Sequence, residues 1–131
     1  MLVENIMTPK EKLVMVSQMA SLQVALKKMK EHGIKAVIVD KASPSGAYGL
    51  VTFKNILQSI VAEDGDIELL NAYDVANSPV VSVSAKMDIK YAARMMVNNG
   101  MKRLLVIDNN EIKGILTMTD IVGILLDSIE N

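Results

Sequence analysis

A short polar motif near the C-terminus has the residue types of a turn that binds anions or hydroxyl groups. The stretch "GILTMTD", residues 114–120, places Thr117, Thr119 and Asp120 after an apolar run and at the start of an expected helix. A helix N-terminus offers unpaired N–H groups and a partial positive charge, which attract anions. A carboxylate accepts two hydrogen bonds at once and can hold a pair of neighbouring hydroxyls, as in a ribose diol.

The same residues also have a purely structural interpretation, which is helix capping. Thr119 fits the N-cap position, and Asp120 fits the first turn, where the helix dipole favours a negative charge. Thr hydroxyls can equally donate to a phosphate. Capping and binding are compatible, so the motif alone leaves both open.

A second copy of the turn occurs earlier in the chain. The stretch "GLVTFKN", residues 49–55, repeats the Gly, the apolar residues and the Thr at the same spacing. An amide in place of the acid loses charge-assisted hydrogen bonds, at a cost of about 1 kcal/mol or more. We therefore expect two unequal sites. Three polar positions correspond between the copies: Thr52 with Thr117, Lys54 with Thr119, and Asn55 with Asp120.

The repeat extends well beyond these turns, because residues 21–40 align with residues 88–108. Apolar residues at i, i+3, i+4 and i+7 predict one helix face in each copy. Each expected helix has an N-cap residue before it and a Gly after it. A β-rich run, a turn, a second apolar run and a final helix follow, the last at about residues 55–62 and 119–129. The aligned positions are Leu22, Ala25, Leu26 and Met29 with Ile89, Ala92, Ala93 and Met96, Ser21 with Asp88, and Gly33 with Gly100.

Each copy therefore has the order β-α-β-β-α, which predicts an α+β fold. We expect a first repeat over residues 1–62, a connection over 63–74 and a second repeat over 75–131. A half of about 60 residues is marginal as a separate domain. Two halves packed sheet to sheet, with pseudo-two-fold symmetry, would bury both apolar faces.

Composition excludes several classes of function. The 14 basic and 15 acidic residues nearly balance, which argues against a nucleic-acid or anionic-membrane surface. With no Cys and a single His, His32, the chain has no set of metal ligands of the zinc type, and a cytoplasmic location is expected. Neither a signal peptide nor a membrane-spanning run is predicted. No nucleophile–base pair or phosphate-binding Gly-Lys-Thr loop is present, so we do not expect an enzyme.

A tandem pair that opens with "IMTP", passes through "GMKRLLVID" and closes with "GILTMTD" resembles the cystathionine-β-synthase (CBS) domain pair, also called a Bateman module. The resemblance covers nearly the whole chain and rests on the duplicated order with both turns in register. It implies that the Asp of the turn, Asp120, binds the ribose of an adenine nucleotide.

The resemblance also implies a role for the basic pair Lys102 and Arg103, which would reach the phosphates, and for Met101, which would contact adenine. Arg suits this role because its planar guanidinium binds phosphate oxygens bidentately. Solvated charges and a plain core Met are the alternatives. In the first copy Lys35 matches Lys102, but Ala36 replaces Arg103 and offers no phosphate contact.

The Pro-containing opening segments complete the expected site. Thr8 and Ser78 each precede a Pro, which biases them toward extended backbone. The resemblance implies that the opening segment of one repeat packs beside the other and lines the adenine pocket. We therefore pair Thr8 with the Asp120 site, and Ser78 with the weaker site of Lys35, Thr52, Lys54 and Asn55.

The expected function is that of a stand-alone regulatory module. It would bind AMP, ADP or ATP in the cleft between the repeats as a regulatory ligand, need no cofactor, and act as an energy or metabolite sensor. S-adenosylmethionine or NAD binding, or a ligand-free interaction and dimerisation module, are the alternatives. The final helices, at residues 55–62 and 119–129, are apolar on more than one face, which favours a homodimer through them. A separate regulated protein is the other expected partner.

Overall fold

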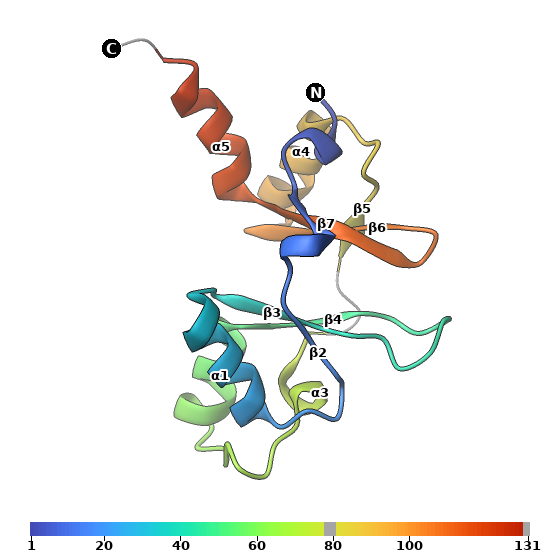
Figure 1. The fold of residues 1–131 in the computed structure, drawn as a ribbon. Coiled ribbons are helices and arrows are strands. Elements are labelled where there is room, and N and C mark those ends of the chain that lie inside the picture. Colours follow the sequence, from blue (N-terminus) through green and yellow to red (C-terminus); the bar gives the residue numbers. More distant parts are fainter. Residues whose placement is uncertain (78–80, 130–131) are drawn as a thin grey trace. The chain divides into compact units, whose positions relative to one another are not determined.

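The structure, a computed structural model, describes residues 1–77 and 81–129 (Figure 1). The chain divides into two compact units, one formed by Met1–Leu13 with Val81–Asn131 and the other by Val14–Val80. Each unit contains one sheet and its own helices, so the predicted α+β class is confirmed.

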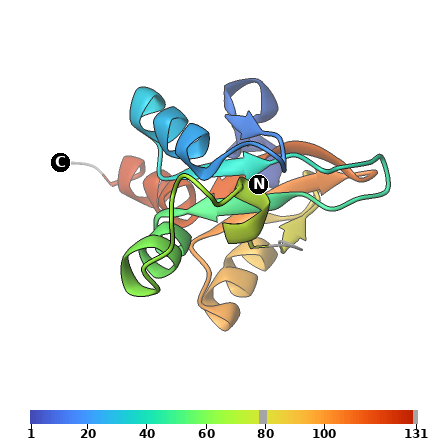
Figure 2. The same ribbon diagram turned by 90° about the horizontal axis from the view of Figure 1, so that it is seen from below.

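The unit Val14–Val80 is built on a three-stranded sheet of order β2-β3-β4. Strand β2 runs parallel to β3, and β3 runs antiparallel to β4. In Figure 2, which views the chain from below, the helices of this unit lie in front of β3 and β4. The elements are β2 (Met15–Val16), α1 (Leu22–His32), β3 (Ala36–Val39), β4 (Gly49–Thr52), α2 (Phe53–Ile56), the π-helix η3 (Leu57–Ala62) and α3 (Ala72–Val75).

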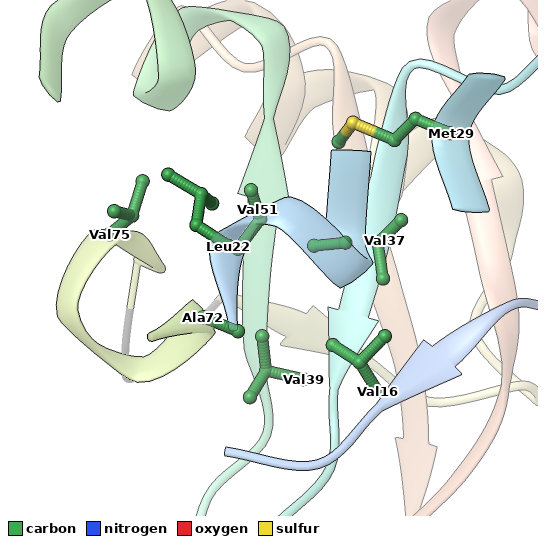
Figure 3. Close-up of a cluster of buried hydrophobic side chains, with 9 residues drawn as sticks. Val16, Leu22, Met29, Val37, Val39, Val51, Ala72 and Val75 are labelled. Carbon is green, nitrogen blue, oxygen red and sulfur yellow. The ribbon is translucent and has the colours of Figure 1, made fainter. Parts of the chain in front are cut away.

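One face of this sheet packs on the helices. Val37 and Val39 of β3 and Val51 of β4 point to the same side, because alternate strand residues share a face and these positions pair across the strands. They meet the predicted apolar face of α1, including Leu22 and Met29 (Figure 3). Ala72 and Val75 of α3 close the same cluster, so the connection between the repeats is anchored in this core.

The other unit has a four-stranded sheet of order β1-β7-β6-β5. Helices α4 and α5 lie on the same side of this sheet (Figure 1). The two units together repeat the order β-α-β-β-α, as predicted. The elements are η1 (Val3–Asn5), β1 (Thr8–Pro9), η2 (Lys10–Lys12), β5 (Ser82–Val83), α4 (Ile89–Asn99), β6 (Arg103–Asp108), β7 (Glu111–Thr117) and α5 (Met118–Asp127).

The first helix of each repeat begins and ends where the sequence predicts. The Ser21 hydroxyl accepts a hydrogen bond from the Val24 N–H (3.2 Å), and the Asp88 carboxylate accepts one from the Lys90 N–H (2.9 Å). The latter bond lowers the pKa of Asp88 below its ordinary value. Gly33 and Gly100 end the helices in the left-handed conformation, with φ of 62° and 61°.

The last helices differ from the prediction. Helix α5 spans Met118–Asp127 instead of residues 119–129, because Thr117 and not Thr119 is its N-cap. In the first repeat, residues 55–62 do not form one regular helix. The single α-helical turn α2 passes into the π-helix η3 there.

The repeats exchange their opening segments between the two units. Strand β1, from the start of the first repeat, pairs antiparallel with β7, with Thr8 opposite Ile115 and Pro9 opposite Gly114. In the other unit, Asn77 from the start of the second repeat forms a bridge with Leu50. The bounds of the two compact units therefore differ from the bounds of the predicted repeats, because each unit includes the opening segment of the other repeat.

Candidate functional site

Thr117 and Asp120 form a reciprocal cap at the start of α5. The Thr117 hydroxyl oxygen accepts a hydrogen bond from the Asp120 N–H (3.0 Å), and the Thr117 N–H donates to Asp120 Oδ2 (2.9 Å). Two N-terminal donors are thereby satisfied. The predicted N-cap, Thr119, is wrong. Thr119 lies one residue into the helix, at an exposed position.

The cap uses only part of the acceptor capacity of Asp120. Within the described part of the chain, Oδ2 accepts one hydrogen bond and Oδ1 has no hydrogen-bond partner. A carboxylate has about four acceptor positions on its two oxygens. The half-buried Asp120 can therefore close the cap and still accept hydroxyl donors from a ligand.

Arg103 and Thr8 share a sheet face with Thr117. Arg103 lies directly opposite Thr117 across β6 and β7, and Thr8 lies opposite Ile115, two residues from Thr117. Directly opposed residues point to the same face, as do alternate residues of one strand. Leu104 and Leu116, which alternate with these positions, belong instead to the core cluster beneath the helices. The polar residues thus occupy the sheet face opposite the one that α4 and α5 cover.

The remaining predicted residues of this site have simpler surroundings. The Lys102 carbonyl accepts the Met118 N–H (2.9 Å), which holds the start of α5 against the start of β6. Its side chain is exposed. Met101 is half-buried and packs against the core cluster, in agreement with its alternative interpretation as a core residue.

The first copy closes the same cap with an amide. Asn55 Oδ1 accepts hydrogen bonds from both the N–H and the hydroxyl of Thr52, each at 2.9 Å. Two bonds fill the acceptor capacity of an amide oxygen, and the other end of the side chain is a donor. Asn55 is also buried. It therefore lacks the spare acceptors of Asp120.

The other positions of the first copy follow the predicted asymmetry. Ala36 lies opposite Thr52, in the place that Arg103 takes opposite Thr117. Lys35 and Lys54 are exposed. Ser78, also predicted for this copy, lies outside the described residues.

The sequence analysis missed why the turn begins with Gly. A Cβ at Gly114 would collide with the Thr8 carbonyl oxygen, so only Gly lets β1 reach this edge of the sheet. A Cβ at Gly49 would come within 3.2 Å of Ala76 Cβ, beside the opening segment of the second repeat. The sequence does show a Gly at the same position of both turns. The reason for it is a contact with a segment that is distant in the sequence, which the local pattern does not reveal.

Comparisons with known proteins agree with this duplicated architecture. The model of the family described as the CBS domain matches residues 3–62 and again residues 72–127. The chain belongs to the CBS-domain family. CBS-domain pairs are regulatory modules rather than enzymes, as predicted.

Individual relatives support the family without fixing a ligand. An uncharacterised protein of Methanopyrus kandleri is 32% identical over 100 residues, which are 74% of this chain and 50% of that protein. The chain thus spans about half the length of this relative. A hexameric CBS-CP12 protein from bloom-forming cyanobacteria is 25% identical, with a TM-score of 0.86 over 100% of this chain and 76% of that chain. CBSX2 in complex with AMP is 21% identical, with a TM-score of 0.81 over 98% of this chain and 99% of that chain.

Two kinds of feature are absent from the described residues. None of the helices there is long and apolar enough to cross a membrane. No group of three or more His, Asp or Glu residues is placed to hold a metal ion in residues 1–77 and 81–129.

Proposed function

We propose that the chain is a regulatory CBS-domain pair that binds an adenine nucleotide, such as AMP, ADP or ATP, at the Asp120 turn. The observation that carries the proposal is the spare acceptor capacity of Asp120 at the end of β7, where Arg103 lies opposite Thr117 and Thr8 lies opposite Ile115. A nucleotide needs acceptors for its ribose and donors for its phosphates, and both lie at this end of β7.

Each part of the ligand has a matching group. The two ribose hydroxyls donate to the Asp120 carboxylate, which strengthens these bonds through its charge. The phosphates lie near the positive end of the α5 dipole, the Thr119 hydroxyl and the cations Lys102 and Arg103. In this proposal Thr8, which β1 brings to β7, borders the adenine. Met101 precedes β6 and would contact the adenine from the core side.

The first copy is proposed as the weaker site. Asn55 has no spare acceptor for a diol, and Ala36 supplies no guanidinium. Lys35 and Lys54 retain positive charge for a phosphate. We therefore expect one dominant binding event in each chain.

The adenine nucleotide class rests on the carboxylate and the cations together. The AMP complex of CBSX2 supports it by fold likeness. S-adenosylmethionine and NAD share the ribose and adenine, so they remain the alternative ligands. The phosphate donors at the turn favour AMP, ADP and ATP over S-adenosylmethionine, whose sulfonium is cationic.

Paired substitutions test the site. Asp120→Asn keeps an oxygen for the cap, as Asn55 does, but removes the charge and the spare acceptors. We expect AMP affinity to fall about tenfold, which corresponds to about 1.4 kcal/mol, with little change in melting temperature. Asn55→Asp is the matched control and should improve binding only slightly. Isothermal titration calorimetry with AMP, ADP, ATP, S-adenosylmethionine and NAD gives the ranking.

Equal AMP affinity of the wild type and Asp120→Asn would reduce Asp120 to a helix cap. A nucleotide at 100 times its dissociation constant stabilises the folded state by about 2.7 kcal/mol. If none of the five ligands raises the melting temperature, the ligand-free interaction module is the better description.

We further propose that two chains form a homodimer in the cytoplasm, as suits a sequence without Cys. The support is a stripe of exposed apolar residues on the last helix of each repeat, which exceeds the isolated apolar residues of ordinary surfaces. An isologous, two-fold pairing would cover both stripes. The stripes consist of Phe53, Leu57 and Val61 of α2 and η3, and of Met118, Val122, Leu125 and Leu126 of α5 with Ile129 just beyond it.

A further inference from the structure

Besides the candidate site, the two repeats differ at a pair of matched surface positions. Ser21 bridges Asn71 and Asp88 bridges Leu2, so the residues before these N-caps correspond. By this register Met19 matches Lys86 and Tyr73 matches Glu4. Lys86 and Glu4 form an ion pair at 2.8 Å. Met19 and Tyr73 are instead exposed, at 74% and 59%.

The backbone hydrogen bonds confirm that register. The Tyr73 N–H donates to the Gln18 carbonyl (3.2 Å), as the Glu4 N–H donates to the Ala85 carbonyl (2.9 Å). Likewise the Ala72 N–H donates to the Ala20 carbonyl (2.7 Å). Met19 and Tyr73 therefore occupy adjacent backbone positions, as Lys86 and Glu4 do. In the second repeat these two positions are held by the ion pair of Lys86 and Glu4. In the first repeat they are the exposed apolar residues Met19 and Tyr73.

A third exposed apolar residue lies nearby along the chain, on a fixed backbone. Leu69, in the turn before α3, is 79% exposed. On the inward side, Ala72 and Val75 are buried in the core cluster (Figure 3), and Leu70 packs against it. The Asp74 carboxylate caps the Asn71 N–H (2.8 Å). A backbone held in this way presents its outward side chains with little entropy left to lose on binding.

The charged residues along the connecting segment have one sign. From residue 55 to residue 85 the sequence contains no Lys or Arg. Glu68 and Asp74 directly flank Leu69 and Tyr73, and both are exposed. Among the described residues, none of the acids in this stretch forms an ion pair. These acids are Glu63, Asp64, Asp66, Glu68 and Asp74.

We propose that Met19, Leu69 and Tyr73, with Glu68 and Asp74 at their rim, form a docking surface for a basic amphipathic segment of a partner protein. We name it the connection surface. Apolar anchors of the segment cover Met19, Leu69 and Tyr73, and its Lys or Arg residues pair with the acidic rim. A Met and a Tyr suit such a role, because a Met adapts its shape and a Tyr loses little entropy. This proposal is independent of nucleotide binding.

The test uses a defined probe, since the partner is not identified. An 18-residue peptide of Leu and Lys, with Leu at helical spacing on one face, is titrated into the isotopically labelled full chain at physiological salt. Its counterpart of Leu and Glu is titrated in parallel. We expect amide shifts at residues 18–20 and 66–76 with the Lys peptide, and at least tenfold weaker binding of the Glu peptide.

Two pairs of variants separate apolar from charged recognition. The double variant Met19→Lys with Tyr73→Glu installs the ion pair of the other repeat at unchanged net charge. It should lower the affinity for the Lys peptide about tenfold or more. Its melting temperature should stay near that of the wild type. Glu68→Lys should weaken it severalfold, whereas Glu11→Lys, with the same charge change elsewhere, should not.

Three results would overturn the proposal. They are unchanged affinity in the double variant and in Glu68→Lys, shifts that map to Phe53, Leu57 and Val61 instead, or equal binding of both peptides. Shifts at the connection surface that appear on raising the protein concentration alone, and vanish in the double variant, would assign the surface to a second copy of the chain.

Discussion

At the scale of single residues, Asp120 and Asn55 do the same work for the backbone. Each closes a cap by accepting the N–H of a Thr three residues earlier at 2.9 Å. The cap therefore needs an acceptor oxygen and not a charge. The carboxylate adds only surplus acceptor capacity, which the fold itself does not use. This surplus is what makes Asp120, and not Asn55, the better ligand candidate.

A substitution at Gly114 tests the close contact between β1 and β7. We expect Gly114→Ala to destabilise the fold by about 1–3 kcal/mol, because the new Cβ collides with the Thr8 carbonyl oxygen. Gly123→Ala in α5 is the matched control. A Cβ at Gly123 meets nothing within 4 Å, so helix propensity should stabilise it by up to about 1 kcal/mol. Urea unfolding measures both, and effects of the same sign would contradict the contact.

Asp108 predicts a pH dependence. Hydrogen bonds from Ser84 and from the Ala85 N–H (3.1 Å) lower the pKa of its carboxyl below the ordinary value of 3.8. A lowered folded pKa stabilises the fold above pH 3.8, and this contribution is lost as the pH falls toward the folded pKa. The effect should stay below about 1 kcal/mol, because the group is accessible to water.

The variant Asp108→Asn isolates this effect. It should be less stable than the wild type at pH 7, and the difference should shrink as the pH falls from about 5 to 2. Unfolding free energies across this pH range give the answer. A constant difference for Asp108→Asn would show that its charge is irrelevant.

At the scale of elements, the sequence predicted the helices whose ends and faces depend on residues close to one another in the chain. The helices α1 and α4, with Ser21 and Asp88 as N-caps and Gly33 and Gly100 at their ends, follow from local capping and a 3.6-residue period. The π-helix after α2 was not predicted. Gly65 follows this π-helix in the chain and folds back onto it, because a Cβ at Gly65 would clash with the carbonyl oxygen of Ser59 in the π-helix. The geometry of the π-helix therefore depends on the turn that follows it.

The N-cap of α5 was assigned to the wrong Thr, and a pair of variants can confirm the correction. Thr117→Ala should cost about 1 kcal/mol, because it leaves the Asp120 N–H without its acceptor. Thr119→Ala should be nearly neutral for stability, since Thr119 is exposed at the second helical position. Thermal unfolding without ligand compares the two. A larger loss for Thr119→Ala would restore the original assignment.

At the scale of the whole molecule, the exchange of opening segments explains which part of the site was predictable. Lys102, Arg103, Thr117 and Asp120 come from one repeat, and their spacing alone points to one end of a strand pair. Thr8 comes from the other repeat, far from these residues along the chain. Its place beside β7 followed only from the family resemblance, since no local pattern encodes a pairing of distant segments.

The proposed dimer is the last test at this scale. Replacing Leu125 with Glu puts a charge in the middle of the stripe on α5, where Leu125 is 62% exposed in the single chain. Burying an unpaired charge costs several kcal/mol, so the dimer should dissociate. Leu69→Glu, at a residue that is 79% exposed on the connection surface, should leave the dimer intact. Sedimentation equilibrium measures both. If Leu125→Glu stays dimeric and Leu69→Glu becomes monomeric, the self-association surface is the connection surface, and the stripes on the last helices have another partner.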